Sequence, residues 1–234
     1  MSSKVLALFH LGNVGYMAKL EVTVGDYPAP EITVHEKFAE SISFARAWVR
    51  KTLGLESPDL PFTWTLDPAY QDIDGYSLFG AFASALLQEH ARLRVERADL
   101  MRGGSHVSLT KIRATSLSCV AISAGMDTDD LEGGFKTVGK IDEKLIRLTS
   151  SDLKGSACVL AWGQARPVGW PVEQWNGTRW ARAAGTPPAQ LYEKWHVPNA
   201  RTPLPIIRAH DAIDAILRVF DMQCNSAGSK LLPI

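Results

Sequence analysis

The chain has 234 residues, and its 25 Lys and Arg residues are balanced by 25 Asp and Glu residues, so the formal net charge is zero. Apolar residues make up 46% and charged residues 21%, which is typical of a globular protein and excludes a disordered one. The balanced charge argues against nucleic acid or an anionic membrane as the main partner, because both attract basic surfaces.

Hydrophobic patterning in the first half of the chain predicts alternating strands and helices. Residues 19–24 alternate between polar and apolar side chains, as a strand with one buried face does. From Glu36 onward apolar residues recur at three- and four-residue steps, which predicts a helix that Gly54 ends. A later segment is apolar almost all round, so we expect a helix buried in the core. The predicted elements are strands over residues 5–10, 18–24 and 62–66 and helices over 36–53 and 77–94.

The second half of the chain has shorter elements and one unusual segment. We predict strands over residues 106–111, 117–123 and 157–162, a short helix over 140–148 and a closing amphipathic helix over about 210–221. Residues 163–205 are rich in proline and tryptophan, which predicts an irregular insertion with one short helix at 189–195. Its tryptophans either anchor the segment on the domain or form a surface that binds a substrate or partner protein.

The order of these elements predicts one α/β (α+β) domain over residues 1–234, with a mixed sheet packed against helices. No apolar run approaches the roughly 20 residues of a membrane span, and the first residues do not have the pattern of a secretory signal. The three cysteines, Cys119, Cys158 and Cys224, are far apart, which predicts neither a disulfide framework nor a cysteine zinc site. We therefore expect a cytoplasmic protein without a metal or a cofactor.

Ser77 is the first candidate for a chemical role. An acidic loop that contains Asp74 and Gly75 leads into it, and a buried helix follows. At a helix start the backbone N–H groups and the helix dipole can stabilise a developing oxyanion. A nucleophilic serine also needs a base. The alternative is that Ser77 is an N-cap, a position that serine fills well.

Lys144 is the second candidate. It lies in a predicted short helix whose apolar residues face inward, so its amine can be partly buried. Burial lowers the pKa of a lysine and allows it to act as a general base. The alternative is an exposed helical lysine that pairs with Asp or Glu.

Together these stretches resemble the proteolytic domain of the Lon protease family. The serine motif of that family is D-G-P-S-A-G followed by an alanine-rich helix, and its lysine motif is G-G-x-K-E-K followed by two apolar residues. A third motif, V-A-M-T-G-E, is matched by the residues that begin at Val120. The likeness covers roughly residues 4–162 and the last helix. Ser123 stands where the third motif has a threonine, and the positions that match the motifs include Asp74, Gly75, Ser77, Gly139, Glu143 and Lys144.

The resemblance implies a ribosomal protein S5 domain 2-like fold and a serine peptidase with a Ser77–Lys144 dyad. Neutral Lys144 would take the Ser77 proton, and the serine would attack the carbonyl of a protein or peptide substrate. Ser123 would orient Lys144, while Asp74 and Gly75 would shape the serine loop. The chain has no G-x-x-x-x-G-K-[ST] motif of an ATPase. Cleavage is therefore expected to be independent of ATP or served by a separate unfoldase or regulatory partner, and the family's ring assemblies imply a homo-oligomer.

Several positions depart from the family motifs, including Leu78, which replaces the alanine after the serine. Tyr76 replaces the proline before the serine, Phe79 replaces a glycine that could leave room for substrate, and Lys140 replaces a glycine of the lysine motif. These changes favour an alternative in which the domain is catalytically degenerate and acts as a protein-binding or assembly module. A Ser–His–Asp triad and an unrelated α/β domain with chance matches also remain open, although no G-x-S-x-G motif is present.

Overall fold

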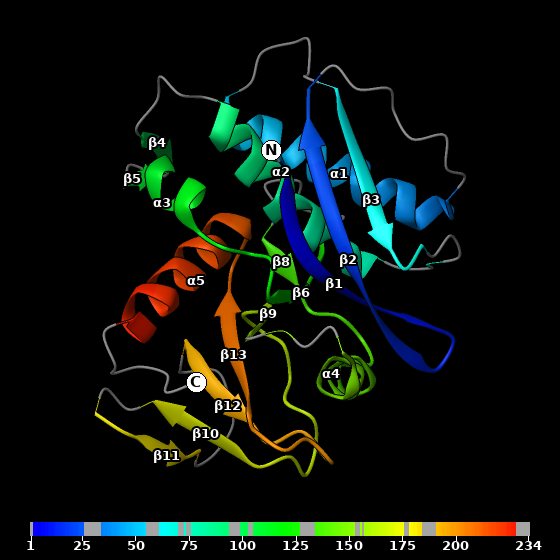
Figure 1. The fold of residues 1–234 in the computed structure, drawn as a ribbon, viewed down its shortest axis with the longest axis vertical. Coiled ribbons are helices and arrows are strands. Elements are labelled where there is room, and N and C mark those ends of the chain that lie inside the picture. Colours follow the sequence, from blue (N-terminus) through cyan, green and yellow to red (C-terminus); the bar gives the residue numbers. More distant parts are fainter. Residues whose placement is uncertain are drawn as a thin grey trace.

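A nine-stranded mixed sheet forms the centre of the molecule (Figure 1). The computed structural model describes residues 2–25, 34–54, 61–69, 73, 76–93, 99–102, 105–126, 134–152, 155, 157–175, 178–183 and 191–227, with the backbone alone at 101, 102 and 105. The order of the strands is β11-β10-β12-β13-β9-β6-β1-β2-β3. Their bounds are β1 Ser3–Leu11, β2 Val14–Val24, β3 Phe62–Asp67, β6 Val120–Ser123, β9 Ala157–Ala161, β10 Val172–Trp175, β11 Trp180–Arg182, β12 Tyr192–Trp195 and β13 Leu204–Ala209.

Four parallel strands lie in the middle of this sheet. β1, β6, β9 and β13 pair in parallel, while β2 and β3 continue the sheet antiparallel on one side and β12, β10 and β11 on the other. The carboxyl ends of β1, β6, β9 and β13 therefore meet at one edge, the usual place for ligands in sheets of this kind. Two small hairpins add β4 Asp99–Arg102 with β5 Ser105–Ser108 and β7 Gly125–Met126 with β8 Phe135–Lys136.

Helices cover the two faces of the sheet unequally. One face packs with α1, α2, α3 and α5 around an apolar core that includes Val5, Ala7 and Phe9 of β1. The other residues of β1, Leu6 and Leu8, face a smaller core that α4 covers. In Figure 1, α4 lies apart from the other helices and is seen nearly end-on. The helix bounds are α1 Glu36–Leu53, α2 Phe79–Leu93, α3 Leu109–Ala114, α4 Ile141–Ser150 and α5 Ala212–Ala227.

Two crossover connections of opposite hand bring helices to the same edge of the sheet. The chain passes from β3 to β6 over the face that carries α2, and from β6 to β9 over the face that carries α4. Both connections join parallel strands and step across the sheet in the same direction, so one of them is left-handed, which is rare. As a result the segment before α2 contacts β1 and β6 on one face of the sheet, and α4 contacts β1 and β2 on the other.

The structure confirms an α/β fold with a mixed sheet packed against helices, and it corrects three local predictions. Residues 109–111 belong to helix α3 and not to a strand, because Ser108 caps the helix by accepting a hydrogen bond from the Lys111 amide. The described part of the segment 163–205 is not irregular throughout, since it supplies β10, β11 and β12 to the main sheet. The short helix expected at 189–195 is wrong, because Tyr192–Trp195 is strand β12 and residues 189–190 lie outside the described residues.

Among the described residues, no helix combines the length and the apolar character needed to cross a bilayer.

Candidate functional site

Ser77 lies in a single 3₁₀ turn, η1 (Tyr76–Leu78), directly before α2. The helix begins two residues later, so the serine is not its N-cap. The Gly80 amide donates a hydrogen bond of 3.0 Å to the carbonyl of Ala124, just beyond β6, which places the turn at the carboxyl edge of the sheet. The hydroxyl of Tyr76 donates to Glu40 Oε2 at 2.6 Å and ties the turn to α1. Ser77 itself is 6% exposed.

Phe79, the bulky residue at a family glycine position, turns into the core. Its side chain is buried and meets the ring of Phe135 in β8 edge to face, with the centroids 6.4 Å apart. The ring therefore occupies the core between α2 and β8, and not the surface beside Ser77.

Lys144 is completely buried, although it is a lysine. It lies in the first turns of α4, on the face of the helix that covers the smaller core. Its Nζ has no hydrogen-bond partner among the described residues. Burial lowers the pKa of Lys144 from the ordinary value of 10.5 to about 8, because water that would solvate the ammonium is absent. A sizeable fraction of the amine is thus neutral in mildly alkaline solution.

Cys158 of β9 faces the smaller core that α4 covers and affects the pKa of Lys144. Burial raises the pKa of the Cys158 thiol, so the cysteine stays neutral. On α4 itself, a side-chain hydrogen bond to Asp142 raises the pKa of Glu143, and Glu143 Oε2 is buried without a hydrogen-bond partner among the described residues. Neither neighbour supplies Lys144 with the strong paired charge that a buried ammonium requires.

The start of α4 packs on the β1–β2 turn, a contact that the sequence did not predict. Lys140 precedes α4 in the left-handed conformation, with φ 53°, and its Nζ donates hydrogen bonds to the Gly12 carbonyl and, at 2.7 Å, to Asn13 Oδ1. A Cβ at Gly15 would clash with the Glu143 carbonyl and lie 2.7 Å from the Lys144 amide nitrogen. Two features of the sequence could have indicated this contact. Lys140 stands at a family glycine position, and Gly15 is a glycine near the start of a strand.

Ser123 is the last residue of β6 and is fully buried on the face that α4 covers. Its hydroxyl donates to the carbonyl of Leu8 at 3.4 Å, a long hydrogen bond within the sheet. In this structure the hydroxyl does not bond to Lys144, whose Nζ has no partner among the described residues.

The structure places Ser77, Ser123 and the start of α4 at the same edge of the sheet. Neither serine hydroxyl is hydrogen-bonded to Lys144 Nζ. η1 packs against β1, β6 and β7, whereas α4 packs against β1 and β2, so β1 is their shared neighbour. The Ser77–Lys144 hydrogen bond of a working dyad is absent, because Lys144 Nζ has no partner among the described residues. Asp74 and Gly75 lie outside the described residues.

A second buried polar cluster joins the strands of residues 163–205 to the rest of the sheet. Glu193 of β12 accepts hydrogen bonds from Arg166, Trp195 and Arg208, the last at 3.2 Å. Burial acts to raise the pKa of Glu193, but the hydrogen bond from Arg166 and the charge of Arg208 outweigh it and lower that pKa. The carboxylate is thus fully engaged within the protein.

The tryptophans of this region pack mainly on neighbouring side chains. Trp170 meets Trp195 edge to face at 6.4 Å, and Trp175 lies 5.7 Å from Trp180. Trp162 stacks on His210 with the centroids 4.5 Å apart. These contacts agree with an anchoring role, and a role in binding substrate stays a prediction.

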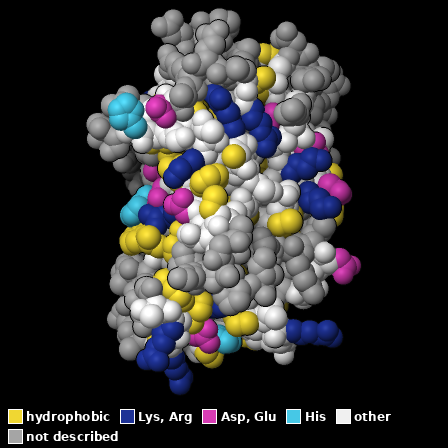
Figure 2. All heavy atoms as spheres, turned by 60° about the vertical axis from the view of Figure 1, so that its left-hand side comes forward, with side chains coloured by type: hydrophobic (Ala, Val, Ile, Leu, Met, Phe, Trp, Pro, Cys, Tyr) yellow, Lys and Arg dark blue, Asp and Glu magenta, His cyan; other side chains and the backbone are white. Residues whose placement is uncertain are grey.

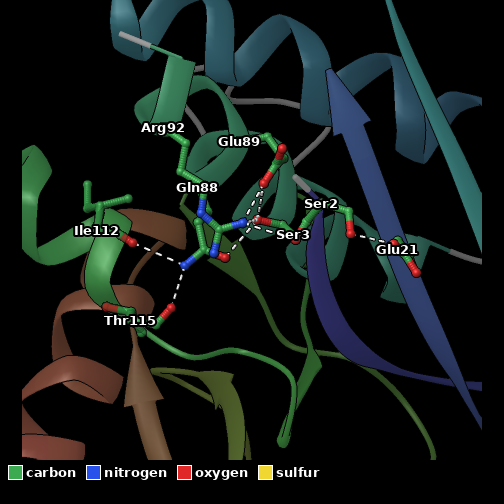
Figure 3. A network of polar contacts seen from close by, with 8 residues as sticks. All are labelled: Ser2, Ser3, Glu21, Gln88, Glu89, Arg92, Ile112 and Thr115. Carbon is green, nitrogen blue, oxygen red and sulfur yellow. Dashed lines mark hydrogen bonds and ion pairs between the residues drawn. The ribbon is translucent and has the colours of Figure 1, made fainter. Parts of the chain in front are cut away.

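A third polar cluster ties the end of α2 to β1 and α3 (Figure 3). The Gln88 amide donates to the carbonyls of Ile112 and Thr115 and accepts from the Ser3 hydroxyl at 2.7 Å. Arg92 donates to Glu89 at 2.5 Å. Each of these groups has a hydrogen-bond partner inside the cluster, as expected of a cluster that stabilises the fold.

Charged side chains on the face seen in Figure 2 lie in small groups. Acidic side chains accompany the basic ones on the right of the view, and the hydrophobic side chains form short separate strips. Within the part of the chain that the structure describes, no group of three or more His, Cys, Asp or Glu residues is placed to hold a metal ion. Comparison of the chain with models of known protein families and with curated proteins gave no match.

Proposed function

We propose that this protein is a Lon-like serine peptidase in which Ser77 is the nucleophile and Lys144 the general base. The observation that carries the proposal is the fully buried Lys144 amine with a pKa near 8 and no hydrogen-bond partner among the described residues. A lysine is rarely buried without a partner, because its desolvation is costly. Perturbed titratable groups of this kind gather at functional sites.

The reaction follows from the two side chains. Neutral Lys144 takes the proton of the Ser77 hydroxyl as Ser77 Oγ bonds to the carbonyl carbon of the substrate peptide. Lys144 then gives that proton to the leaving amine as the peptide bond breaks and an acyl-enzyme forms. Water, deprotonated by the same amine, hydrolyses the ester and restores Ser77. This chemistry needs a state in which Ser77 Oγ comes within hydrogen-bond distance of Lys144 Nζ.

Cleavage of an unfolded protein tests the proposal. Casein should be cut by the wild type, and Ser77→Ala should reduce cleavage to background. Lys144→Met should lower kcat by about 10²- to 10⁴-fold, the usual worth of a general base. Lys111→Met is a matched control, because this half-exposed lysine pairs with Asp221 at 3.7 Å on the surface. Full activity of Ser77→Ala would exclude the serine as nucleophile.

The pH profile gives a second test of the base. Lys144 must be neutral to accept a proton, so kcat/KM should rise with pH and level off above about 8, the pKa of the buried amine. A rate that is constant between pH 6 and pH 9 would be incompatible with this lysine as the base.

One observation favours a second candidate function, a catalytically degenerate domain that binds or assembles proteins. Lys144 Nζ has no hydrogen-bond partner among the described residues, and therefore none in Ser77 or Ser123. In this case neither casein nor peptides are cut, and a fluorophosphonate probe leaves Ser77 unlabelled. Either function is compatible with a separate unfoldase or regulatory protein and with self-assembly.

A further inference from the structure

We propose that Lys140 is a positioning residue, which clasps the β1–β2 turn and thereby holds the first turn of α4 so that the Lys144 amine stays buried. Its effect on catalysis rests on the proposed function, whereas its effect on Lys144 itself does not. The argument begins with how α4 starts, because Lys144 lies in its first turns.

The start of α4 has little local support. Its N-cap position makes no side-chain capping hydrogen bond, although such a cap stabilises many helices. The N-cap residue is Lys140 itself, with φ 53° and ψ 43°. This left-handed conformation is unfavourable for a residue with a Cβ atom. Contacts outside the helix must therefore hold this residue in place.

The side chain of Lys140 provides such contacts. Its ammonium donates to the Gly12 carbonyl and to Asn13 Oδ1, at 2.7 Å for the second. These acceptors form the tip of the β1–β2 turn, which is 127 positions away in sequence. The Lys140 ammonium thus links the start of α4 to the turn that follows β1.

The backbone transmits this contact to Lys144. The Lys144 amide donates to the Lys140 carbonyl at 3.4 Å, which closes the first turn of α4. From the opposite side Gly15 approaches so closely that a Cβ there would lie 2.7 Å from the same Lys144 nitrogen. Lys140 and Gly15 therefore meet at the backbone of Lys144, one through a hydrogen bond and the other through close packing.

The groups that face Lys144 explain why its position matters for its protonation. Glu143 and Asp142 lie on α4 and Lys140 lies directly before it, Cys158 lies on β9, and Arg208 of β13 lies close enough to Cys158 to affect its pKa. On β1 and β2, the strands that α4 packs against, Leu6, Leu8 and Met17 face α4, and the alternation of the strands places Lys4, His10, Lys19 and Glu21 on the same face, with Lys4 paired to Glu21. A loosened first turn admits water to Lys144 and raises its pKa.

The test is an NMR titration of the Lys144 side chain, assigned from the resonance lost in Lys144→Met. In Lys140→Met we expect the pKa of Lys144 to rise by about one unit, which corresponds to a roughly tenfold fall in its neutral fraction at pH values below about 7. Lys111→Met, on a distant surface, should leave the titration of Lys144 unchanged.

The Lys140→Gly variant separates the effect of the Lys140 ammonium from the effect of its backbone conformation. Glycine adopts the left-handed conformation without cost, so this variant keeps the helix start but lacks the ammonium. The pKa of Lys144 should rise in it as well. An unchanged Lys144 titration in folded Lys140→Gly overturns the proposal, because the residue then acts through its backbone alone. Asn13→Ala, which removes one acceptor, should give a smaller rise and serves if the Lys140 variants fail to fold.

The peptidase assay distinguishes this proposal from the proposed function. In an active enzyme the acidic limb of the kcat/KM profile should move to higher pH in Lys140→Met by the same amount as the pKa of Lys144. No cleavage by the wild type together with a raised Lys144 pKa in Lys140→Met refutes the peptidase and retains the clasp. Cleavage by the wild type with no change in either measurement refutes the clasp alone.

Discussion

At the scale of single residues, the buried Lys144 should make the protein less stable near neutral pH. Below pH 8 the amine is protonated in both the folded and the unfolded chain, and its burial costs the folded state. A pKa of about 8 in place of 10.5 corresponds to about 3 kcal/mol. Between these two pH values the unfolded chain binds the proton that the folded chain has released, so stability rises with pH.

We therefore expect Lys144→Met to raise the free energy of unfolding at pH 7 by about 3 kcal/mol. The advantage of the variant should shrink between pH 8 and pH 10.5, where the wild type loses the buried charge. Urea unfolding at several pH values, compared with wild type, measures this difference. A less stable Lys144→Met at pH 7 would show that the amine has a partner in solution.

At the scale of elements, sequence patterning predicted most helices and strands, and the misses have physical causes. Residues 106–111 contain enough apolar residues for a strand, but Ser108 caps a helix instead. β13 was missed because Pro203 and Pro205 argue against a strand. Pro205 pairs with Lys194 of β12, and pairing with β9 begins only at Ile206, so the missing N–H of proline does no harm.

The candidate site was predictable in part. The apolar spacing around Lys144 made a partly buried amine one of two alternatives, and burial is observed, although Ile146, which was expected to face inward, is exposed. The clasp at Lys140 joins residues far apart in sequence, so no local pattern indicates it. The position of Ser77 relative to Lys144 depends on the two crossovers, which composition and periodicity do not determine.

The cluster at the end of α2 gives a prediction at this scale. Gln88→Ala leaves the buried carbonyls of Ile112 and Thr115 without their donor. Each buried group without a partner costs about 1–3 kcal/mol, so we expect a loss of at least 2 kcal/mol in the free energy of unfolding. Gln223→Ala is the matched control, because Gln223 makes similar hydrogen bonds to Ser116 on the surface. Equal losses in the two variants would contradict this interpretation.

At the scale of the whole molecule, the Glu193 cluster joins the antiparallel strands β12, β10 and β11 to the parallel centre of the sheet. Glu193→Ala leaves Arg208, which is fully buried, without its carboxylate. Removing one partner of a buried ion pair costs about 3–5 kcal/mol. Glu173→Ala breaks only a half-exposed pair with His196 and should cost less than about 1 kcal/mol. Thermal unfolding of the two variants tests the difference.

The strand order also has a consequence for how the protein is made. β1 is complete at Leu11, but its parallel neighbour β6 begins only at Val120, and β13 follows at Leu204. On the ribosome the early chain can therefore form only the β1–β2–β3 meander with α1 and α2. The apolar side chains that later face α4 remain in contact with water during most of synthesis. We expect stalled nascent chains to bind chaperones, and to become resistant to proteases only after β13 has emerged.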